Sequence, residues 1–451
     1  MTKDLTQGKP IITIILMSLP IMLGNLFQQL YNIADTIIVG RLIGSNALAA
    51  VGSTASLTFM IMWFITGEAS GFAILLAEHF GAGDTDKLRK DVCIALELST
   101  AITLAVTILC LIWLKPFLIF MNTPGEILDN AYIYSFTIIA GMLTTMFYNI
   151  NAAILRAMGD SKTPLYFLII SSVLNILLDV LFIAVFGLGV FGAALATVIS
   201  QGASGILCFI YMCNHFTELK FLRSDWVFDV KHAASLLSYG LPAGLYAAST
   251  GIGILILQFA INCYGTNVIA GFTAAIKVQN FAEIPLNAFA VTMVNYEGQN
   301  HGAKRYDNMK NGFVQCSILG VITAFICGVL IYVLGDDFTS AFVDGGASPE
   351  VIDFAVRYLR ITAYCFILYS VLLVTRSSLQ GMGDKTTPVV NGIIESVFRC
   401  LATIYLMKNL SEQLLCLVNP TIWGIAALFL VIRYFIHWNR VIKPEIAELD
   451  M

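Results

Sequence analysis

Acidic and amide side chains inside long apolar stretches are the residues of this sequence best suited to ion chemistry. Asp35 lies near the end of the first stretch, and a later stretch carries Asn175 and Asp179, four residues apart and therefore on one helix face. Thr197 follows Ala193 by four residues in the next stretch. Ionisable groups are costly inside a membrane, so each one requires a reason. Oxygen ligands suit a hard cation, and two close carboxyls need a proton or a cation to coexist.

The helical rise predicts a similar depth for these groups. Asp179 lies about 14 residues, or ~21 Å, beyond the start of its helix at Leu165. Thr197 lies about 8 residues, or ~12 Å, from the start of its helix at Gly189, on the opposite side. The two distances together match a hydrocarbon thickness of ~30 Å. We therefore predict a site for H⁺ or Na⁺ at this depth. Asp35 would lie somewhat closer to the outer surface of the membrane than Asp179 and Thr197, unless its helix bends. The alternative, that these groups only hydrogen-bond between helices, stays open.

Other charged side chains within the apolar stretches are candidates for a substrate cavity or for an ion pair. Glu283 is a candidate for the substrate cavity, where it would attract cations, or else a neutralising partner of Lys277. Glu68 has no evident partner in the sequence and is a second candidate for the substrate cavity. Glu395 and Arg399 are four residues apart, which predicts an ion pair that clamps the structure.

The elements that carry these residues are twelve apolar segments, each near or above the ~20 residues that cross a bilayer. We expect them at 11–39, 47–76, 92–114, 131–155, 165–186, 190–213, 234–263, 268–296, 312–334, 355–379, 388–407 and 414–437. Hydrophobic residues make up 58% and charged residues 12%, about half the ~25% charged share of soluble domains. The short alternating strands of a membrane barrel are missing from the pattern. We predict an all-α polytopic membrane protein.

Three sequence motifs occur twice, about half a chain apart. Met158–Pro164 returns as Met382–Pro388, 224 residues later, and two further motifs return at an offset of 221. In a chain this apolar, a two-fold internal repeat indicates a transporter. We predict two pseudo-symmetric six-helix lobes, at residues 1–213 and 234–451, joined by a cytoplasmic linker at 214–233.

The distribution of basic residues predicts the orientation. Lys and Arg concentrate in the loops of one side, as at Lys87, Arg89 and Lys90, whereas the loop 335–350 on the other side is acidic. The positive-inside rule then puts both termini in the cytoplasm of a plasma-membrane protein. The ten cysteines make no Cys-x-x-Cys pair and are interpreted as small reduced hydrophobic residues, not as metal ligands or disulfides. No cofactor is expected.

The sequence resembles the multidrug and toxic compound extrusion (MATE) family over essentially its full length. The motifs that carry the resemblance occur in the family's order: Tyr31–Thr36 with Gly40 and Gly44, Phe80–Asp84, Arg156–Asp160, Asn175–Asp179, Gly192–Thr197 and Gly298–Ala303. Each motif is weak by itself, whereas their order across twelve segments is specific. The resemblance implies two lobes that rock between outward-open and inward-open forms, driven by H⁺ or Na⁺.

The resemblance also implies the coupling residues. In archaeal and bacterial members an N-lobe cation site corresponds to Asp35, Asn175, Asp179, Ala193 and Thr197. Glu68 departs from the family, where a small or uncharged residue is expected, and this bears on the substrate. The segment 355–379 has no match for the acidic coupling residue that some branches use in the C-lobe, which favours coupling in the N-lobe.

We therefore expect an antiporter, not an enzyme, that exports amphipathic, cationic organic compounds in exchange for H⁺ or Na⁺. Its partners would be these small molecules and membrane lipid, without nucleic acid, and it would act as a monomer. A lipid-linked saccharide flippase of the same superfamily is the first alternative, although basic residues within the spans that could meet phosphate, such as Lys277, Arg376 and Arg399, are few. An intramembrane enzyme or receptor is a remote second, because no span has a central histidine and the duplication would be unexplained.

Overall fold

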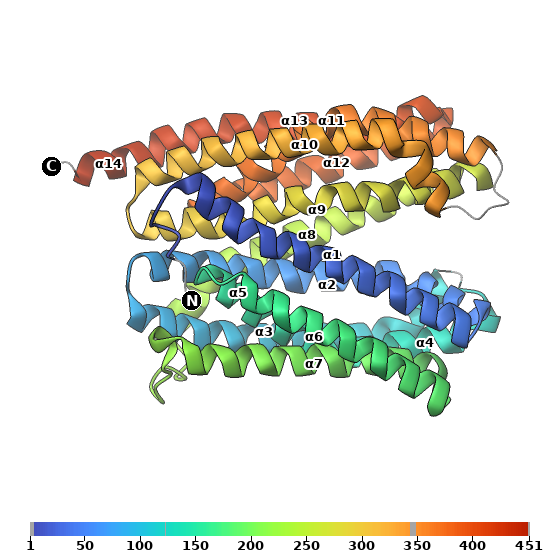
Figure 1. The fold of residues 1–451 in the computed structure, drawn as a ribbon, viewed down its shortest axis with the longest axis horizontal. Helices are drawn as coiled ribbons and strands as arrows, with labels where there is room; N and C mark the ends of the chain where they lie inside the picture. The colour runs from blue at the N-terminus through green and yellow to red at the C-terminus, as the bar shows by residue number, and fades with distance from the viewer. Residues whose placement is uncertain (1–3, 122, 343–348, 450–451) are drawn as a thin grey trace. The chain divides into compact units, whose positions relative to one another are not determined.

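The computed structural model describes residues 4–121, 123–342 and 349–449, and within these ranges the chain is helical with no β-strand (Figure 1). In chain order the α-helices are α1 (Pro10–Leu42), α2 (Ser45–Gly81), α3 (Thr85–Phe120), α4 (Gly125–Ala140), α5 (Met142–Ala157), α6 (Lys162–Asp179), α7 (Gly189–His215), α8 (Val230–Ile261), α9 (Thr266–Gly302), α10 (Tyr306–Phe342), α11 (Pro349–Gly381), α12 (Thr387–Asn409), α13 (Glu412–His437) and α14 (Lys443–Leu449). Two π-helical segments, η1 (Val180–Val185) and η3 (Trp438–Ile442), and a short 3₁₀ helix, η2 (Thr217–Leu219), complete the elements.

Most of these helices are suited to cross a bilayer. Within the described residues, ten helical segments are long and apolar enough to do so, and α4 with α5 makes an eleventh if that bent pair crosses as one. Helix α9 is 37 residues long; polar side chains such as Lys277, Glu283 and Asn287 interrupt its apolar run. In lipid a helix satisfies its own backbone hydrogen bonds, which explains why long apolar runs adopt this form. The predicted all-α, multi-pass membrane protein is confirmed.

The segment expected at 131–155 is not one straight helix. The chain bends by 44° between α4 and α5, at Gly141. A Cβ atom at Gly141 would lie 2.2 Å from a methyl carbon of Val198 on α7. The missing side chain allows α7 to approach the bend, and this requirement of the packing is not visible in the hydrophobic pattern.

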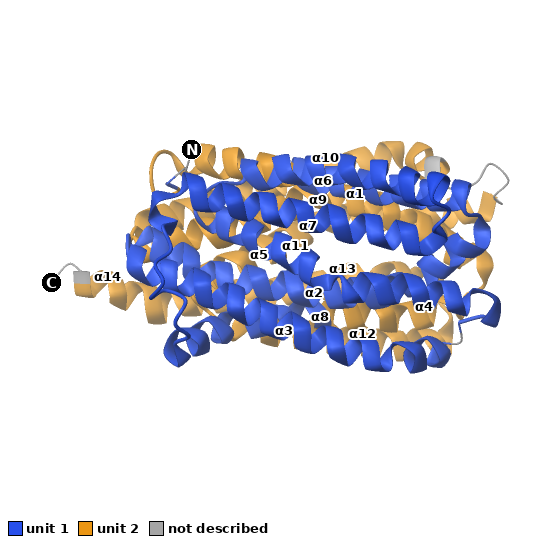
Figure 2. Ribbon diagram, turned by 90° about the horizontal axis from the view of Figure 1, so that it is seen from below, with its two compact units in different colours: residues 1–4, 23–248 blue, residues 5–22, 249–451 orange. Residues whose placement is uncertain are grey.

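The described residues form two compact units, coloured separately in Figure 2. Unit 1 takes in residues 23–248, and unit 2 takes in residues 5–22 and 249–451. The divisions fall within α1 and within α8, so each of these helices has one part in either unit. Two helical units agree with the predicted two-lobe architecture.

Glycines bring α2 and the first part of α8 into close contact within unit 1. A Cβ atom at Gly71 would lie 2.6 Å from the Cα of Gly240, and one at Gly67 would lie 3.1 Å from the Cα of Gly244. Each helix therefore presents two glycines four residues apart, the pattern that allows membrane helices to approach backbone to backbone.

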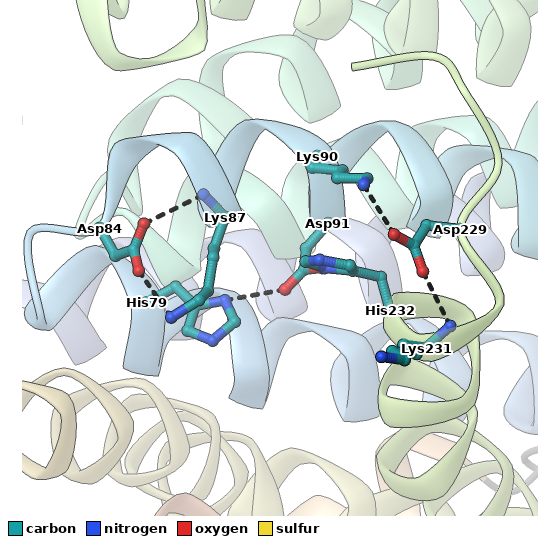
Figure 3. A network of polar contacts seen from close by, with 8 residues as sticks. All are labelled: His79, Asp84, Lys87, Lys90, Asp91, Asp229, Lys231 and His232. Carbon is teal, nitrogen blue, oxygen red and sulfur yellow. Dashed lines mark hydrogen bonds and ion pairs between the residues drawn. The ribbon is translucent and has the colours of Figure 1, made fainter. Parts of the chain in front are cut away.

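Polar contacts fasten the start of α8 to α3 in the same unit (Figure 3). Asp91 of α3 is fully buried, with His79 Nδ1 2.8 Å from one carboxylate oxygen and His232 Nδ1 in contact with the other. Beside it, Lys90 Nζ donates to Asp229 at 2.7 Å, and the backbone N–H of Lys231 donates to the same carboxylate at 2.9 Å. The network joins α2, α3 and α8 at one end of unit 1.

The repeated Met-Gly-Asp turn has the same structure in both halves of the chain. Asp160 accepts hydrogen bonds from the N–H of Thr163 at 3.0 Å and from its hydroxyl at 2.6 Å. Asp384 accepts from the N–H of Thr387 at 2.9 Å and from its hydroxyl. Burial opposes ionisation of Asp384, but the hydrogen bonds from Thr387 outweigh it and lower the pKa of this carboxyl. The shared geometry is that of a duplicated unit.

Candidate functional site

The hydroxyl of Thr197 is the meeting point of three helices in unit 1. It lies 3.3 Å from the Tyr31 hydroxyl of α1, and it accepts from Asn175 Nδ2 of α6, also at 3.3 Å. It is also within 3.2 Å of the backbone oxygen of Ala193, one turn earlier on α7. The four-residue spacings expected from the sequence therefore place Asn175, Ala193 and Thr197 in one cluster.

The two aspartates of the cluster face each other. Their carboxyls, Asp35 on α1 and Asp179 on α6, are within hydrogen-bonding reach, and Asp179 is fully buried. Two ionised carboxylates are both acceptors and cannot bond to each other. Accordingly Asp35 Oδ1, both oxygens of Asp179 and Oδ1 of Asn175 have no donor among the described residues. One proton shared by the pair would join one oxygen of each carboxyl in a hydrogen bond, and one cation between them would bind several of these oxygens.

The available ligand atoms are carboxylate, amide, hydroxyl and carbonyl oxygens. This set suits a proton or a hard monovalent cation. In the described part of the chain no group of three or more His, Cys, Asp and Glu side chains is arranged to hold a metal ion.

Two tyrosines in this site were not among the predicted residues. Tyr31 precedes Asp35 by one helical turn, so helix periodicity places it on the same face. Tyr134 of α4 is close enough to interact electrostatically with Asp35, Tyr31 and Asp179, but its position comes from the packing of α4, for which the sequence has no signal. Both rings add hydroxyls to the site.

The local backbone changes at Asp179. This residue ends α6, and the π-helical segment η1 follows directly. Single π-helical turns are frequent at functional sites because they shift backbone groups out of the regular α-helical pattern. Next to the site, Val39, Ile183 and Val190 pack with Ala193 in a small apolar cluster, which surrounds the polar groups with hydrocarbon on that side.

Glu283 lies in unit 2 and is held by hydrogen bonds. Gln279 Nε2 donates to its carboxyl at 2.7 Å, and the Tyr369 hydroxyl donates at 3.3 Å. The Tyr358 hydroxyl donates to Gln279 at 3.1 Å, and Asn419 Nδ2 donates in turn to Tyr358 at 3.1 Å. The network joins α9, α11 and α13, and Glu283 has Gln279 and Tyr369 as its partners.

The other charged residues predicted from the sequence, Glu68, Glu395 and Arg399, each have different neighbours. Glu68 is buried in unit 1, with its carboxyl facing Ser99 of α3. Glu395 of α12 accepts a hydrogen bond from Asn391, at 2.5 Å. The Arg399 guanidinium lies against Gly253 of α8, where an added Cβ atom would be 2.7 Å from Nη1.

Comparison with known proteins gives the family. One family model, MatE, matches the chain twice, over residues 20–181 and 242–404. The chain belongs to the MATE family. The two matched segments start 222 residues apart, which confirms the internal duplication expected from the repeated motifs.

Relatives of this MATE protein are transporters. The probable multidrug resistance protein YpnP of Bacillus subtilis is 27% identical over 391 residues, 87% of each chain. The multidrug export protein MepA of Staphylococcus haemolyticus is 22% identical over 429 residues, 92% of this chain and 91% of MepA. This MATE protein is thus a multi-pass membrane transporter and not an enzyme.

Solved structures share its fold. The crystal structure of a MATE in complex with MaL6 has a TM-score of 0.90 at 24% identity, covering 98% of this chain and all of the other. A MOP superfamily transporter from Pyrococcus furiosus, whose binding pocket is described as reversed in polarity, has a TM-score of 0.87 at 23% identity, covering 96% of this chain and 97% of the other. These likenesses confirm the predicted fold.

Proposed function

We propose that this MATE protein is an antiporter that exports amphipathic, cationic organic compounds in exchange for H⁺ or Na⁺. The observation that carries the proposal is the pair of facing carboxyls, Asp35 and Asp179. No cationic side chain of the described residues acts on either of them. Since two ionised carboxylates this close repel each other in a medium of low dielectric constant, we infer that their site requires an exchangeable cation.

Binding of that cation supplies a coupling mechanism. When the site is empty, repulsion between Asp35 and Asp179 pushes α1 and α6 apart. A proton or Na⁺ removes the repulsion, and the helices pack through Thr197. A ligand shifts a conformational equilibrium only by its differential affinity for the two states. The cation therefore favours the state in which α1 and α6 pack closely, and its release favours the other state of the alternating-access cycle.

The membrane potential favours exchange over simple export. Moving one positive charge across a membrane is worth ~2.3 kcal/mol per 100 mV. Expelling a cation from a negative interior is uphill by this amount. Exchange for one entering proton or Na⁺ cancels the electrical term, and the concentration gradient of the entering ion then drives export.

Glu283 is the residue that we assign to attraction of cationic substrates. Its carboxyl is oriented by Gln279 and Tyr369, and the Tyr369 ring lies beside Trp423, with ring centroids 4.7 Å apart. A carboxylate next to aromatic faces suits an organic cation, which both groups attract. We further propose that the protein acts as a monomer in the plasma membrane, with both termini in the cytoplasm.

The test measures export in proteoliposomes, with a pH gradient and a Na⁺ gradient imposed separately. Asp179→Asn removes one carboxyl of the pair while keeping its size, and we expect it to abolish export driven by the gradient that powers the native protein. Asp129→Asn is the matched control, since Asp129 is exposed on α4. Native export rates in Asp179→Asn would contradict the proposal, as would native export that ignores both gradients.

A further inference from the structure

Glu68 is a buried carboxyl that the Asp35–Asp179 pair does not use. It lies in the middle of α2 with 1% of its surface exposed. Ser99 of α3 is the side chain that faces it, and neither carboxyl oxygen completes a well-formed hydrogen bond within the described residues. No charged side chain of the described chain acts on it. The group thus has a hydroxyl neighbour and no counter-ion.

The surface of α3 that faces Glu68 continues as a stripe of hydroxyls. Ser99, Thr103 and Thr107 follow one another at intervals of four residues, so they share one face of the helix. All three are buried, and none of their hydroxyls has a hydrogen-bond partner in the described part of the protein. Ser135 of α4 is likewise buried, and its hydroxyl has no hydrogen-bond partner among the described residues. Such groups normally have partners, and Thr100, next to Ser99, does donate to the backbone oxygen of Leu96 at 2.7 Å.

The protonation state follows from these neighbours. Burial without a counter-ion strongly disfavours the ionised form of a carboxyl. A neutral carboxyl donates its own O–H to the Ser99 oxygen, and a hydroxyl can accept that bond while it donates another. The stripe from Ser99 to Thr107 then offers a series of hydroxyls along which protons exchange through intervening water.

We propose that Glu68 is a second proton-binding site of unit 1. It holds a proton when α2 and α3 pack as in this structure, and the hydroxyls of α3 deliver that proton. The ligand is a proton, because the neighbours of the carboxyl are hydroxyls, which both donate and accept. A role in export rests on the proposed antiport, in which a second exchangeable proton raises the number of protons moved per substrate. Occupancy of the site does not depend on antiport.

Infrared spectroscopy of the purified full-length protein in lipid tests this occupancy, because a protonated carboxyl has a carbonyl stretch that a carboxylate lacks. We expect a band from a buried protonated carboxyl that is present in the native protein and in Asp179→Asn and lost in Glu68→Gln. Glutamine matches the size and neutrality of the protonated acid, so the variant should keep the native unfolding temperature. Ser99→Ala should keep the band and shift its frequency, because the hydrogen bond to the carboxyl is removed.

The hydroxyl stripe has its own control. Thr103→Val should slow hydrogen–deuterium exchange of the Glu68 band several-fold, whereas Thr100→Val, on the exposed side of the same helix, should leave the rate unchanged. Identical carbonyl regions in the native protein and Glu68→Gln, or a carboxylate band assigned to Glu68, would overturn the proposal. A Glu68 band in a protein that fails to export with either gradient would refute the antiport function alone.

Discussion

Tyr31 of α1 and Thr197 of α7 have their hydroxyl oxygens 3.3 Å apart, next to the facing carboxyls of Asp35 and Asp179. The two helices are not adjacent in the sequence, and the contact joins residues that are 166 positions apart. The hydroxyl pair therefore ties the first helix of the site to the last and orients Thr197 toward Asn175.

Removal of the tyrosine hydroxyl should weaken cation binding. A single hydrogen bond contributes about 1 kcal/mol, so Tyr31→Phe should lower the apparent affinity for the coupling ion about fivefold. The measurement is export in proteoliposomes as a function of ion concentration. Tyr166→Phe is the control, because Tyr166 is exposed on α6; equal effects of the two substitutions would exclude a role for the Tyr31 hydroxyl.

Close packing of α2 against α8 makes Gly71 sensitive to substitution. Gly71→Ala forces a methyl group against the backbone of Gly240, and overpacking of this kind costs about 1–3 kcal/mol. Thermal unfolding in detergent should show a lower midpoint. Gly52→Ala on the same helix meets no atom within 4 Å and should raise the midpoint slightly, since alanine is a better helix former by about 1 kcal/mol. A tolerated Gly71→Ala would show that the helices are further apart.

The ion pair between Lys90 and Asp229 should respond to acid. The hydrogen bond from Lys90, with help from the Lys231 N–H, lowers the pKa of Asp229 to about 2. A carboxyl with a depressed pKa stabilises the folded state at pH values above its unfolded pKa of ~3.9, and this contribution disappears as the pH falls through about 2. Nuclear magnetic resonance titration of labelled aspartates should show the low value.

Lys90→Met tests the cause of this shift. It should raise the pKa of Asp229 toward ~3.9, because the main charge partner is gone. Lys231→Met should change it much less, since Lys231 contributes through its backbone N–H, which the substitution keeps. An unchanged Asp229 titration in Lys90→Met would mean that the pair is not formed in solution.

Asp91 should be important for the stability of unit 1. Its buried carboxyl is hydrogen-bonded to His232 and lies 2.8 Å from His79 Nδ1, and a hydrogen bond to a charged group contributes about 1.5–3 kcal/mol. Asp91→Asn should therefore lower the unfolding temperature at neutral pH, measured by scanning calorimetry. Asp86→Asn on the exposed side of α3 should have little effect, because exposed pairs contribute at most ~1 kcal/mol.

Sequence periodicity was sufficient for the parts of the site that lie on single helices. The four-residue spacings of Asn175 with Asp179 and of Ala193 with Thr197 place each pair on one face, whatever the helix packs against. Tyr134 shows the limit of this reasoning, because its proximity to Asp35 arises from the packing of α4. Glu68 shows the same limit, since the rotation of α3 about its axis decides that Ser99 is its neighbour.

By itself the sequence determined an all-helical membrane protein with an internal duplication, the family, and the acidic residues that a membrane tolerates only for a reason. These properties follow from hydrophobicity, helical period and motif order, which are local along the chain. The tertiary structure decided which side chains from different helices meet: Asp35 with Asp179, Tyr31 with Thr197, and Glu68 with Ser99. It also decided the bend at Gly141 and the division of α1 and α8 between two units. Such contacts depend on close approach of backbones at glycines and on the rotation of each helix, and neither is encoded in a one-dimensional pattern of apolar residues.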